Sequence, residues 1–197
     1  MPLILTAAPA VEPVSLAEAK AHLRVDETVE DALINSLILA ARLHVERALD
    51  MALIEQSWSL YLDAWPGERA VSLPLGPVMT VDAVRVHNAV DEAVTLSPSA
   101  YVVDTVSRDA RIVPRDGLTW PQPGRAANGV EIAFTAGFGA SAANVPQILR
   151  QAILLLIAHW YQEREPIALG QSALAIPHMV SDLIAPYRLS LIHISEP

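Results

Sequence analysis

The sequence lacks several features that would point to particular classes of protein. It contains no cysteine, which excludes a disulfide framework and thiolate chemistry. None of its six histidines forms an H-x-x-x-H pair, so no histidine-based metal motif is present. Its net charge is -9, and its 13 Lys and Arg residues are scattered, whereas tight binding to nucleic acid requires a concentrated basic surface. The composition therefore argues against a sequence-reading DNA-binding module, although an acidic protein can surround DNA without gripping it.

The sequence also lacks an apolar run long enough to cross a membrane. The most apolar stretch, Ala152–Ala158, has seven residues without a polar group and is bounded by Gln151 and His159. A membrane-spanning helix needs about 20 predominantly apolar residues. We therefore predict no membrane anchor and a buried helix over residues 144–165, with Pro146 in its first turn and Pro166 as its stop.

This apolar helix is expected to have two covered sides. The core face is predicted to carry Ile148, Ala152, Leu155 and His159. The opposite side is too apolar for solvent, so we expect the first two helices to cover part of it and a neighbouring subunit the rest. The predicted inter-subunit residues are Ile153, Leu156, Ile157, Trp160 and Tyr161.

The remaining patterns predict one α+β domain over residues 1–197. Residues 14–50 read as two helices, the first opened by a capping box of Ser15 and Glu18. The apolar start, interrupted by prolines, predicts an extended arm. Residues 55–139 hold alternating stretches such as "SWSLYLD" and seven prolines from Pro66 to Pro123, which predict an inserted small antiparallel sheet. Residues 166–197 predict a C-terminal arm with a short helix from about His178 to Ile184.

One motif leaves open an alternative function. "GFGASA", residues 137–142, matches the G-x-G-x-x-A pattern of dinucleotide-binding enzymes. Its context differs, because Pro146 delays the following helix and no acidic strand end follows about 20 residues later. A strand end with a sharp glycine turn is the competing interpretation. No other catalytic constellation is present, and acidic residues such as Asp104, Asp109 and Asp116 are expected in solvated loops. We therefore predict no catalytic, cofactor-binding or metal-binding residue.

A series of stretches resembles a known family. They are "VSLAEAKAHLRV", "LILAARLHVERAL", "SWSLYLDAWP", "LPLGPVMTVDAVRV", "TWP", "VEIAFTAGFG" and "VPQILRQAILLLIAHWYQERE", in order over about residues 12–166. They look like the head–tail connector, or adaptor, proteins of long-tailed phages and gene-transfer agents. Asp50 stands where the resemblance leads us to expect a glycine after the second helix, a departure that concerns the local turn.

The resemblance implies a structural virion protein that is not an enzyme and needs no cofactor. Such adaptors form a ring, usually of twelve copies, under the portal protein at the head–tail junction of a particle made in the bacterial cytoplasm. The ring extends the DNA channel, lets DNA pass without specific binding, and presents a platform to the next tail-side component, a stopper or tail terminator.

Two further sets of residues are candidates for contacts with these partners. The resemblance implies that the C-terminal arm grips the portal, with Met179, Leu183 and Ile184 as apolar anchors and Asp182 and Arg188 as polar ones. The alternative is that the arm folds back on its own subunit. Loops commonly carry binding contacts, so the loops around Trp65, Trp120 and Arg125 are expected to meet neighbouring subunits or the tail-side partner. The alternative for these loops is a set of plain surface turns.

Overall fold

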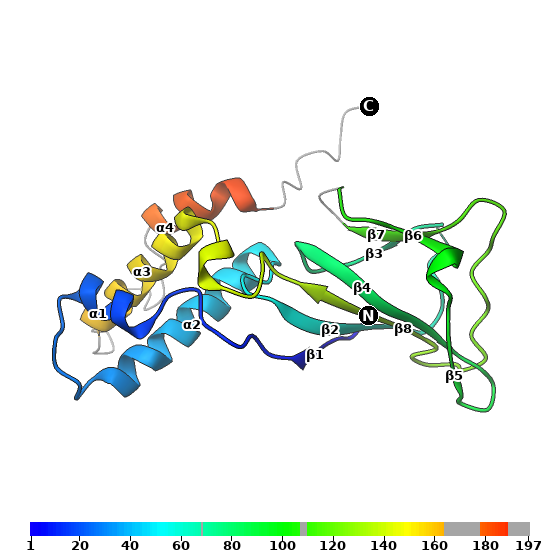
Figure 1. Cartoon of the computed structure of the whole chain (residues 1–197), viewed down its shortest axis with the longest axis horizontal. Helices are drawn as coiled ribbons and strands as arrows, with labels where there is room; N and C mark the ends of the chain where they lie inside the picture. The colour runs from blue at the N-terminus through cyan, green and yellow to red at the C-terminus, as the bar shows by residue number, and fades with distance from the viewer. Residues whose placement is uncertain (68, 107–109, 164–177, 189–197) are drawn as a thin grey trace, which may run out of the picture. The chain divides into compact units, whose positions relative to one another are not determined.

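The chain folds into two compact units in a computed structural model that describes residues 1–67, 69–106, 110–163 and 178–188 (Figure 1). We call them the β unit, which comprises Met1–Ala10 and Ile54–Ala140, and the helical unit, which comprises Val11–Leu53 and the described residues from Ser141 onward. The predictions for Asp109, for the end of the apolar helix at 164–165 and for residues 166–177 and 189–197 of the C-terminal arm lie outside the described residues. The α+β fold class is confirmed.

The helical unit is built around one central helix. Helix α3 (Gln147–Gln162) packs against α1 (Leu16–Leu23), α2 (Asp31–Leu49) and α4 (His178–Ile184). Short 3-10 turns precede α3 at Ala142–Asn144 and follow α4 at Ala185–Tyr187. The fully buried apolar side chains of this unit come from all four helices and include Ala19, Ile34, Ala41, Val45, Leu149, Ala152, Ile153, Leu156, Ile157, Val180 and Ile184.

The ends of α1 and α2 follow from local chemistry. The predicted capping box is confirmed, since the Ser15 hydroxyl accepts from the Glu18 N–H and the Glu18 carboxylate accepts from the Ser15 N–H. Helix α2 ends at Asp50, which adopts a left-handed conformation with φ 51° and donates its N–H to the Glu46 carbonyl. A glycine adopts this conformation without the steric cost that a side chain brings. The departure at Asp50 thus places an aspartate in a glycine-type position.

The predicted faces of α3 were largely reversed. Ile153, Leu156 and Ile157 are fully buried within the chain itself, whereas Ile148 is exposed and Leu155 and His159 are half-buried. Of the predicted core face, only Ala152 is buried. The error arose because α3 is apolar nearly all round, so periodicity could not choose between its two sides. Packing by α1, α2 and α4 made the choice.

The β unit contains two antiparallel sheets rather than the single sheet predicted. The larger has the order β1-β2-β8-β4-β5, and the smaller has the order β3-β7-β6. The extended arm predicted at the start of the chain contributes β1. The strand bounds are β1 (Leu3–Ala7), β2 (Gln56–Leu62), β3 (Val71–Ser72), β4 (Val78–His87), β5 (Ala93–Thr95), β6 (Tyr101–Asp104), β7 (Arg111–Pro114) and β8 (Val130–Ala136), and a 3-10 turn lies at Pro98–Ala100.

Strand β8 forms the middle of the larger sheet. Its side chains alternate between buried and half-buried, and Ile132 and Phe134 are fully buried. Phe134 pairs with Trp58 and Ile132 with Leu60 across β2. The predicted alternation of β2 holds for Leu60 and Leu62, but Ser59 is buried as well, and its hydroxyl donates to the Glu131 carboxylate at 3.1 Å.

The glycines of "GFGASA" have a structural explanation. Gly137 and Gly139 have φ angles of 140° and 145°, which side chains rarely adopt. A Cβ atom on Gly137 would come within 2.6 Å of the Glu55 nitrogen. The Gly139 carbonyl accepts a 3.0 Å hydrogen bond from the Glu55 N–H. Helix α3 begins only at Gln147. The glycines therefore permit a close approach of two backbone segments, as the competing interpretation proposed.

Candidate interaction surfaces

Two of the predicted loop residues form one aromatic cluster in the β unit. The indoles of Trp65 and Trp120 stack with a centroid separation of 4.2 Å and an interplanar angle of 8°. The Trp65 indole N–H donates to the Pro121 carbonyl at 2.7 Å, and the Trp120 indole N–H donates to the Arg69 carbonyl at 3.0 Å. These four groups join two loops that are more than fifty residues apart in the sequence, and both indole N–H groups are satisfied within the cluster.

A groove lies beside the tryptophan pair. Its volume is about 650 Å³, and its lining combines the two indoles with prolines, glycines and the exposed side chain of Leu118. Arg69 and Asp116 form a solvent-exposed ion pair of 3.6 Å beside it. Since both indole N–H groups are already bonded, the two indoles offer ring faces rather than donors, and the donors of the lining are the side chains of Arg69, Thr119 and Gln122. Beside the indoles, the groove therefore suits an apolar or proline side chain.

Arg125 does not belong to this cluster. Its Nε lies 3.7 Å from the Asp91 carboxylate, in an ion pair that is largely open to solvent. Such pairs contribute little to stability. The structure thus brings together two of the three predicted loop residues and leaves the third in a separate surface contact.

An exposed apolar surface lies on α2 in the helical unit, where the sequence had predicted none. Leu39 and Leu43 are 43% and 52% exposed, and they lie one turn apart with Ala32 and Ala40 nearby. None of the exposed positions from 32 to 43 carries a charge. We call Ala32, Leu39, Ala40 and Leu43 the outer face of α2. The sequence signal for this face was the pair Leu39 and Leu43, and it was missed because the other apolar residues of the helix already sufficed for a core-facing side.

Of the predicted inter-subunit residues of α3, Ile153, Leu156 and Ile157 are fully buried inside their own chain and are core residues, whereas Trp160 and Tyr161 are half-buried. Besides the three fully buried aliphatic residues, Trp160 makes an edge-to-face contact with the His44 ring at 5.8 Å. The Tyr161 hydroxyl donates to the Glu30 carboxylate. The side chains of Trp160 and Tyr161 thus connect α3 to His44 of α2 and to Glu30 at its start.

The predicted portal-binding residues divide between the two sides of α4. Ile184 is fully buried together with Val180, and α4 packs against α3, so Ile184 is a core residue rather than an anchor for a partner. This part of the arm folds back on its own subunit, as the alternative proposed. Met179 is 61% exposed, and Asp182 is also exposed. Leu183 is half-buried and Arg188 is exposed beyond the helix end.

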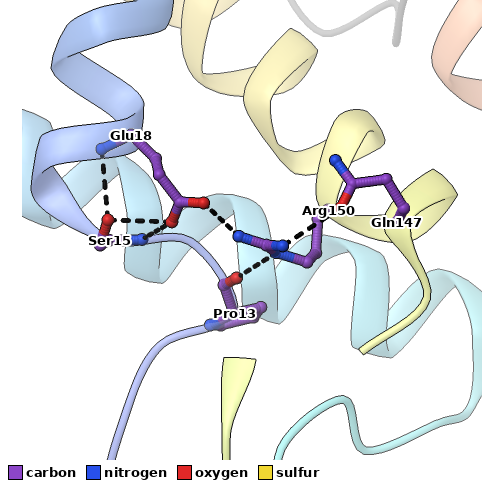
Figure 2. Close-up of polar contacts among 5 residues, drawn as sticks. All are labelled: Pro13, Ser15, Glu18, Gln147 and Arg150. Atoms are coloured by element: carbon purple, nitrogen blue, oxygen red, sulfur yellow. Dashed lines mark hydrogen bonds and ion pairs between the residues drawn. The ribbon is translucent and has the colours of Figure 1, made fainter. Parts of the chain in front are cut away.

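Arg150 connects the start of α1 to α3 (Figure 2). Its Nε donates to the Pro13 carbonyl at 2.9 Å, one terminal nitrogen donates to the Gln147 side chain at 3.1 Å, and the other pairs with Glu18. The pKa of the Glu18 carboxyl is lowered, first by the Ser15 backbone N–H, against the effect of burial, and then by the Ser15 hydroxyl and Arg150. One guanidinium thereby fixes the capping box of one helix onto another.

A second guanidinium, which is buried, holds the two ends of the segment Val11–Leu53. Arg42 is 5% exposed, and it pairs with Glu12 at 2.8 Å and with Glu46 at 2.7 Å. The other oxygen of the Glu46 carboxylate accepts from the Leu53 N–H at 2.9 Å. A buried charge is costly without partners. The Arg42 cluster therefore fixes both Glu12 and Leu53, at the two ends of this segment, to α2.

Two classes of site are not found in the described part of the chain. Among these residues, no three His, Asp or Glu side chains gather so as to hold a metal ion. None of the described helices has the length and apolar content needed to cross a membrane.

Comparisons with known proteins identify the class. Residues 13–93 match the family model described as "Phage gp6-like head-tail connector protein". A chain from the neck of an empty gene transfer agent particle, computed with C6 symmetry, is 31% identical with a TM-score of 0.83, and the match covers 100% of both chains. A chain from the virion of a native gene transfer agent particle is 30% identical, with a TM-score of 0.82 and the same coverage.

A third structure extends the comparison. A chain from the neck of a native gene transfer agent particle, computed with C12 symmetry, is 31% identical over 98% of this chain and 100% of that one, with a TM-score of 0.75. No curated protein matches the sequence. The matches define a structural protein of phage-like particles. The chain belongs to the head–tail connector family.

Proposed function

We propose that the chain is a head–tail adaptor that forms a ring, of twelve copies, in the neck of a phage-like particle or gene-transfer agent. The observation that carries this proposal is the full-length similarity, at 31% identity and a TM-score of 0.83, to a chain from the neck of such a particle. The symmetric necks of the similar structures support a ring. The role is structural, and the proposal includes no catalytic step and no cofactor.

The ring places this chain between the portal protein and the next tail-side component. We assign the portal contact to the exposed side of α4, with Met179 and Asp182, and to Leu183 and Arg188 beside it. We assign the tail-side contact to the tryptophan cluster and its groove. DNA passes through the ring without specific binding, since a net charge of -9 repels phosphates.

The outer face of α2 is assigned to the contact between neighbouring subunits. Soluble monomers rarely leave a continuous uncharged helix face in water, and Leu39 and Leu43 give this face apolar area that a neighbour would cover. In the double variant Leu39→Glu with Leu43→Glu, we expect a folded chain that no longer assembles into rings. The matched control is Ala17→Glu with Ala21→Glu, which places the same added charge on exposed positions of α1.

The decisive experiment removes the gene from a particle-producing strain and images the particles by cryo-electron microscopy. The proposal requires DNA-filled heads without tails, and the restored chain must reappear as a ring at the portal exit. Heads that keep their tails in the absence of this chain would contradict it.

The portal contact has its own test. Removing residues 178–197 would also expose the part of α3 that α4 covers, so loss of folding would confuse the result. Met179→Glu and Asp182→Lys change only exposed positions. We expect folded subunits that join portals poorly, and normal tailed particles from both variants would exclude this side of α4 as the portal contact.

A further inference from the structure

Strand β1 presents an unprotected edge of the larger sheet. It is the first strand in the order β1-β2-β8-β4-β5, and its sequence "LILTA" contains neither a charge nor a proline. Ile4 and Leu5 are 51% and 43% exposed. Natural proteins usually guard an edge strand with charges, prolines or bulges, because its free backbone groups pair readily with another strand. Apart from a register shift between Leu5 and Ala7, β1 lacks these protections.

The register shows which backbone groups of β1 point outward. The Tyr61 N–H donates to the Pro2 carbonyl at 2.9 Å, and Leu3 pairs with Leu60 and Ile4 with Ser59. Hydrogen-bonded and non-hydrogen-bonded pairs alternate in an antiparallel ladder. Ile4 therefore directs its N–H and C=O toward β2, whereas Leu3 and Leu5 direct theirs away from the sheet.

Among the other described edges, β6 has the most similar character. Strand β4 is open where β5 does not cover it, but there it carries Asp82 and two register shifts. Strand β3 has two residues, and β5 has three, preceded by the acidic Asp91 and Glu92. Strand β6, with the sequence "YVVD", is the outer strand of the order β3-β7-β6, and its Val102 is 44% exposed.

The outward groups of β6 follow from the same alternation. The Arg115 N–H donates to the Ala100 carbonyl at 3.0 Å, and Val102 pairs with Val113 across β7. Val102 therefore directs its backbone groups toward β7. Tyr101 and Val103 direct theirs outward. In β6, as in β1, two residues point their backbone N–H and C=O groups outward. The residue between them has an exposed side chain, and its backbone groups point into the sheet.

We propose that β1 of one copy pairs antiparallel with β6 of the neighbouring copy, joining their sheets across the subunit boundary. One register lets all four residues with outward backbone groups form hydrogen bonds between the two strands. It places Leu3 opposite Val103, Leu5 opposite Tyr101 and Ile4 opposite Val102. Opposite residues share one face of a sheet. The two exposed central side chains, Ile4 and Val102, thereby cover each other.

We take a second copy of the chain as the partner of the β1 edge. The edges of β1 and β6 differ from each other and fit each other. This inference rests on the proposed ring. A closed ring is built from head-to-tail interfaces, so every subunit must present two unlike surfaces that fit each other. Figure 1 shows β1 and β6 apart from one another within the β unit, so a β1 strand would meet the β6 of another copy rather than its own.

The absence of cysteine allows a direct test by engineered cross-linking. The central pair is a non-hydrogen-bonded pair, whose Cα atoms lie about 4.5 Å apart, within the range that a disulfide accepts. In assembled particles that carry the full-length variant Ile4→Cys with Val102→Cys, oxidation is expected to give a ladder of covalent oligomers that reducing agent removes. Each single-cysteine variant can give dimers at most. Leu5→Cys with Val102→Cys places the two thiols on opposite faces and should give no ladder.

A pair of proline variants tests the backbone contact. Leu5→Pro deletes an outward N–H without removing a bond to β2, and loss of this contact should lower the yield of joined particles by about tenfold. Thr95→Pro deletes the outward N–H of β5 and should leave the yield unchanged. A ring that assembles without the Ile4–Val102 ladder, and tolerates Leu5→Pro, would overturn the strand pairing and leave the adaptor proposal intact. Absence of any ring at the portal exit would instead overturn the adaptor proposal.

Discussion

Replacing Arg150 tests whether one guanidinium holds the helical unit together. Arg150→Met keeps much of the side-chain length but removes every donor to Pro13, Gln147 and Glu18. The three losses differ in size. Gln147 is exposed and can bond to water, whereas Pro13 is buried, so its carbonyl loses a charged donor that water cannot easily replace.

The expected magnitude follows from these environments. A buried carbonyl that loses a charged donor costs about 1.5–3 kcal/mol. The ion pair adds at most about 1 kcal/mol, because the Glu18 side chain is 44% exposed and solvent screens it. The free energy of unfolding should fall by about 1.5–4 kcal/mol in total, which corresponds to roughly 3–16 °C in Tm for a protein of this size.

Far-ultraviolet circular dichroism can isolate this effect, because every described α-helix lies in the helical unit. The control is Glu18→Gln, which removes the ion pair but keeps a side chain that can complete a capping box. It should cost less than about 1 kcal/mol. A Tm for Arg150→Met within about 2 °C of the unmodified chain, or an equal loss in both variants, would refute the assignment of the main contribution to Pro13.

The pH dependence gives a second test of the same contacts. The folded pKa of the Glu18 carboxyl lies below its ordinary value of 4.5. A lowered pKa stabilises the fold above the unfolded pKa, and this stabilisation disappears as the pH falls through the folded pKa. Since the Ser15 N–H is the largest cause of the lowering, Arg150→Met should retain part of the acid-dependent loss of Tm. Glu18→Gln should remove this group's contribution entirely.

Three further changes have defined outcomes. Asp50→Gly should raise the free energy of unfolding by about 0.5–1 kcal/mol, since glycine relieves both the left-handed conformation and a carboxylate at a helix C-terminus; in urea titrations, Asp50→Asn should recover only the charge component. Trp120→Ala should abolish the indole stack in near-ultraviolet circular dichroism and lower tail attachment, whereas Arg125→Ala should leave both unchanged, and the opposite ranking would exclude the cluster as the tail-side contact. Fluorescence anisotropy should detect no binding to duplex DNA at physiological salt, and submicromolar affinity would count against the proposed channel.

Local patterns in the sequence predicted the elements better than they predicted the contacts between them. The capping box at Ser15 and the short helix at His178–Ile184 were confirmed because both depend on neighbouring residues. The sides of α3 were assigned wrongly because that choice depends on which helices pack against it. The stack of Trp65 on Trp120 could not be predicted either, since more than fifty residues separate the two.

The number of sheets was missed for a related reason. Strand β1 comes from a proline-bounded arm whose sequence does not reveal its partner, and it pairs with β2 more than fifty residues later. Strand β7 connects β3 and β6 into a separate sheet through pairings that alternation within each strand does not specify. A sequence shows which side chains share a face of a strand, but the register and the neighbour of that strand are set by the rest of the fold.

Charged side chains with buried partners and exposed apolar side chains lie in different parts of this chain. Arg42 and Arg150 lie inside the helical unit, where they fix chain segments to α2 and α3. Leucines on α2 and the uncharged strand β1 lie at the surface, where a monomer would ordinarily place charges. Rigid, pre-formed surfaces lose little conformational entropy on binding, so modest apolar contacts can hold a ring together. Replacing the buried Arg42 or the half-buried Arg150 should therefore weaken assembly even though neither residue lies in the proposed contact surfaces.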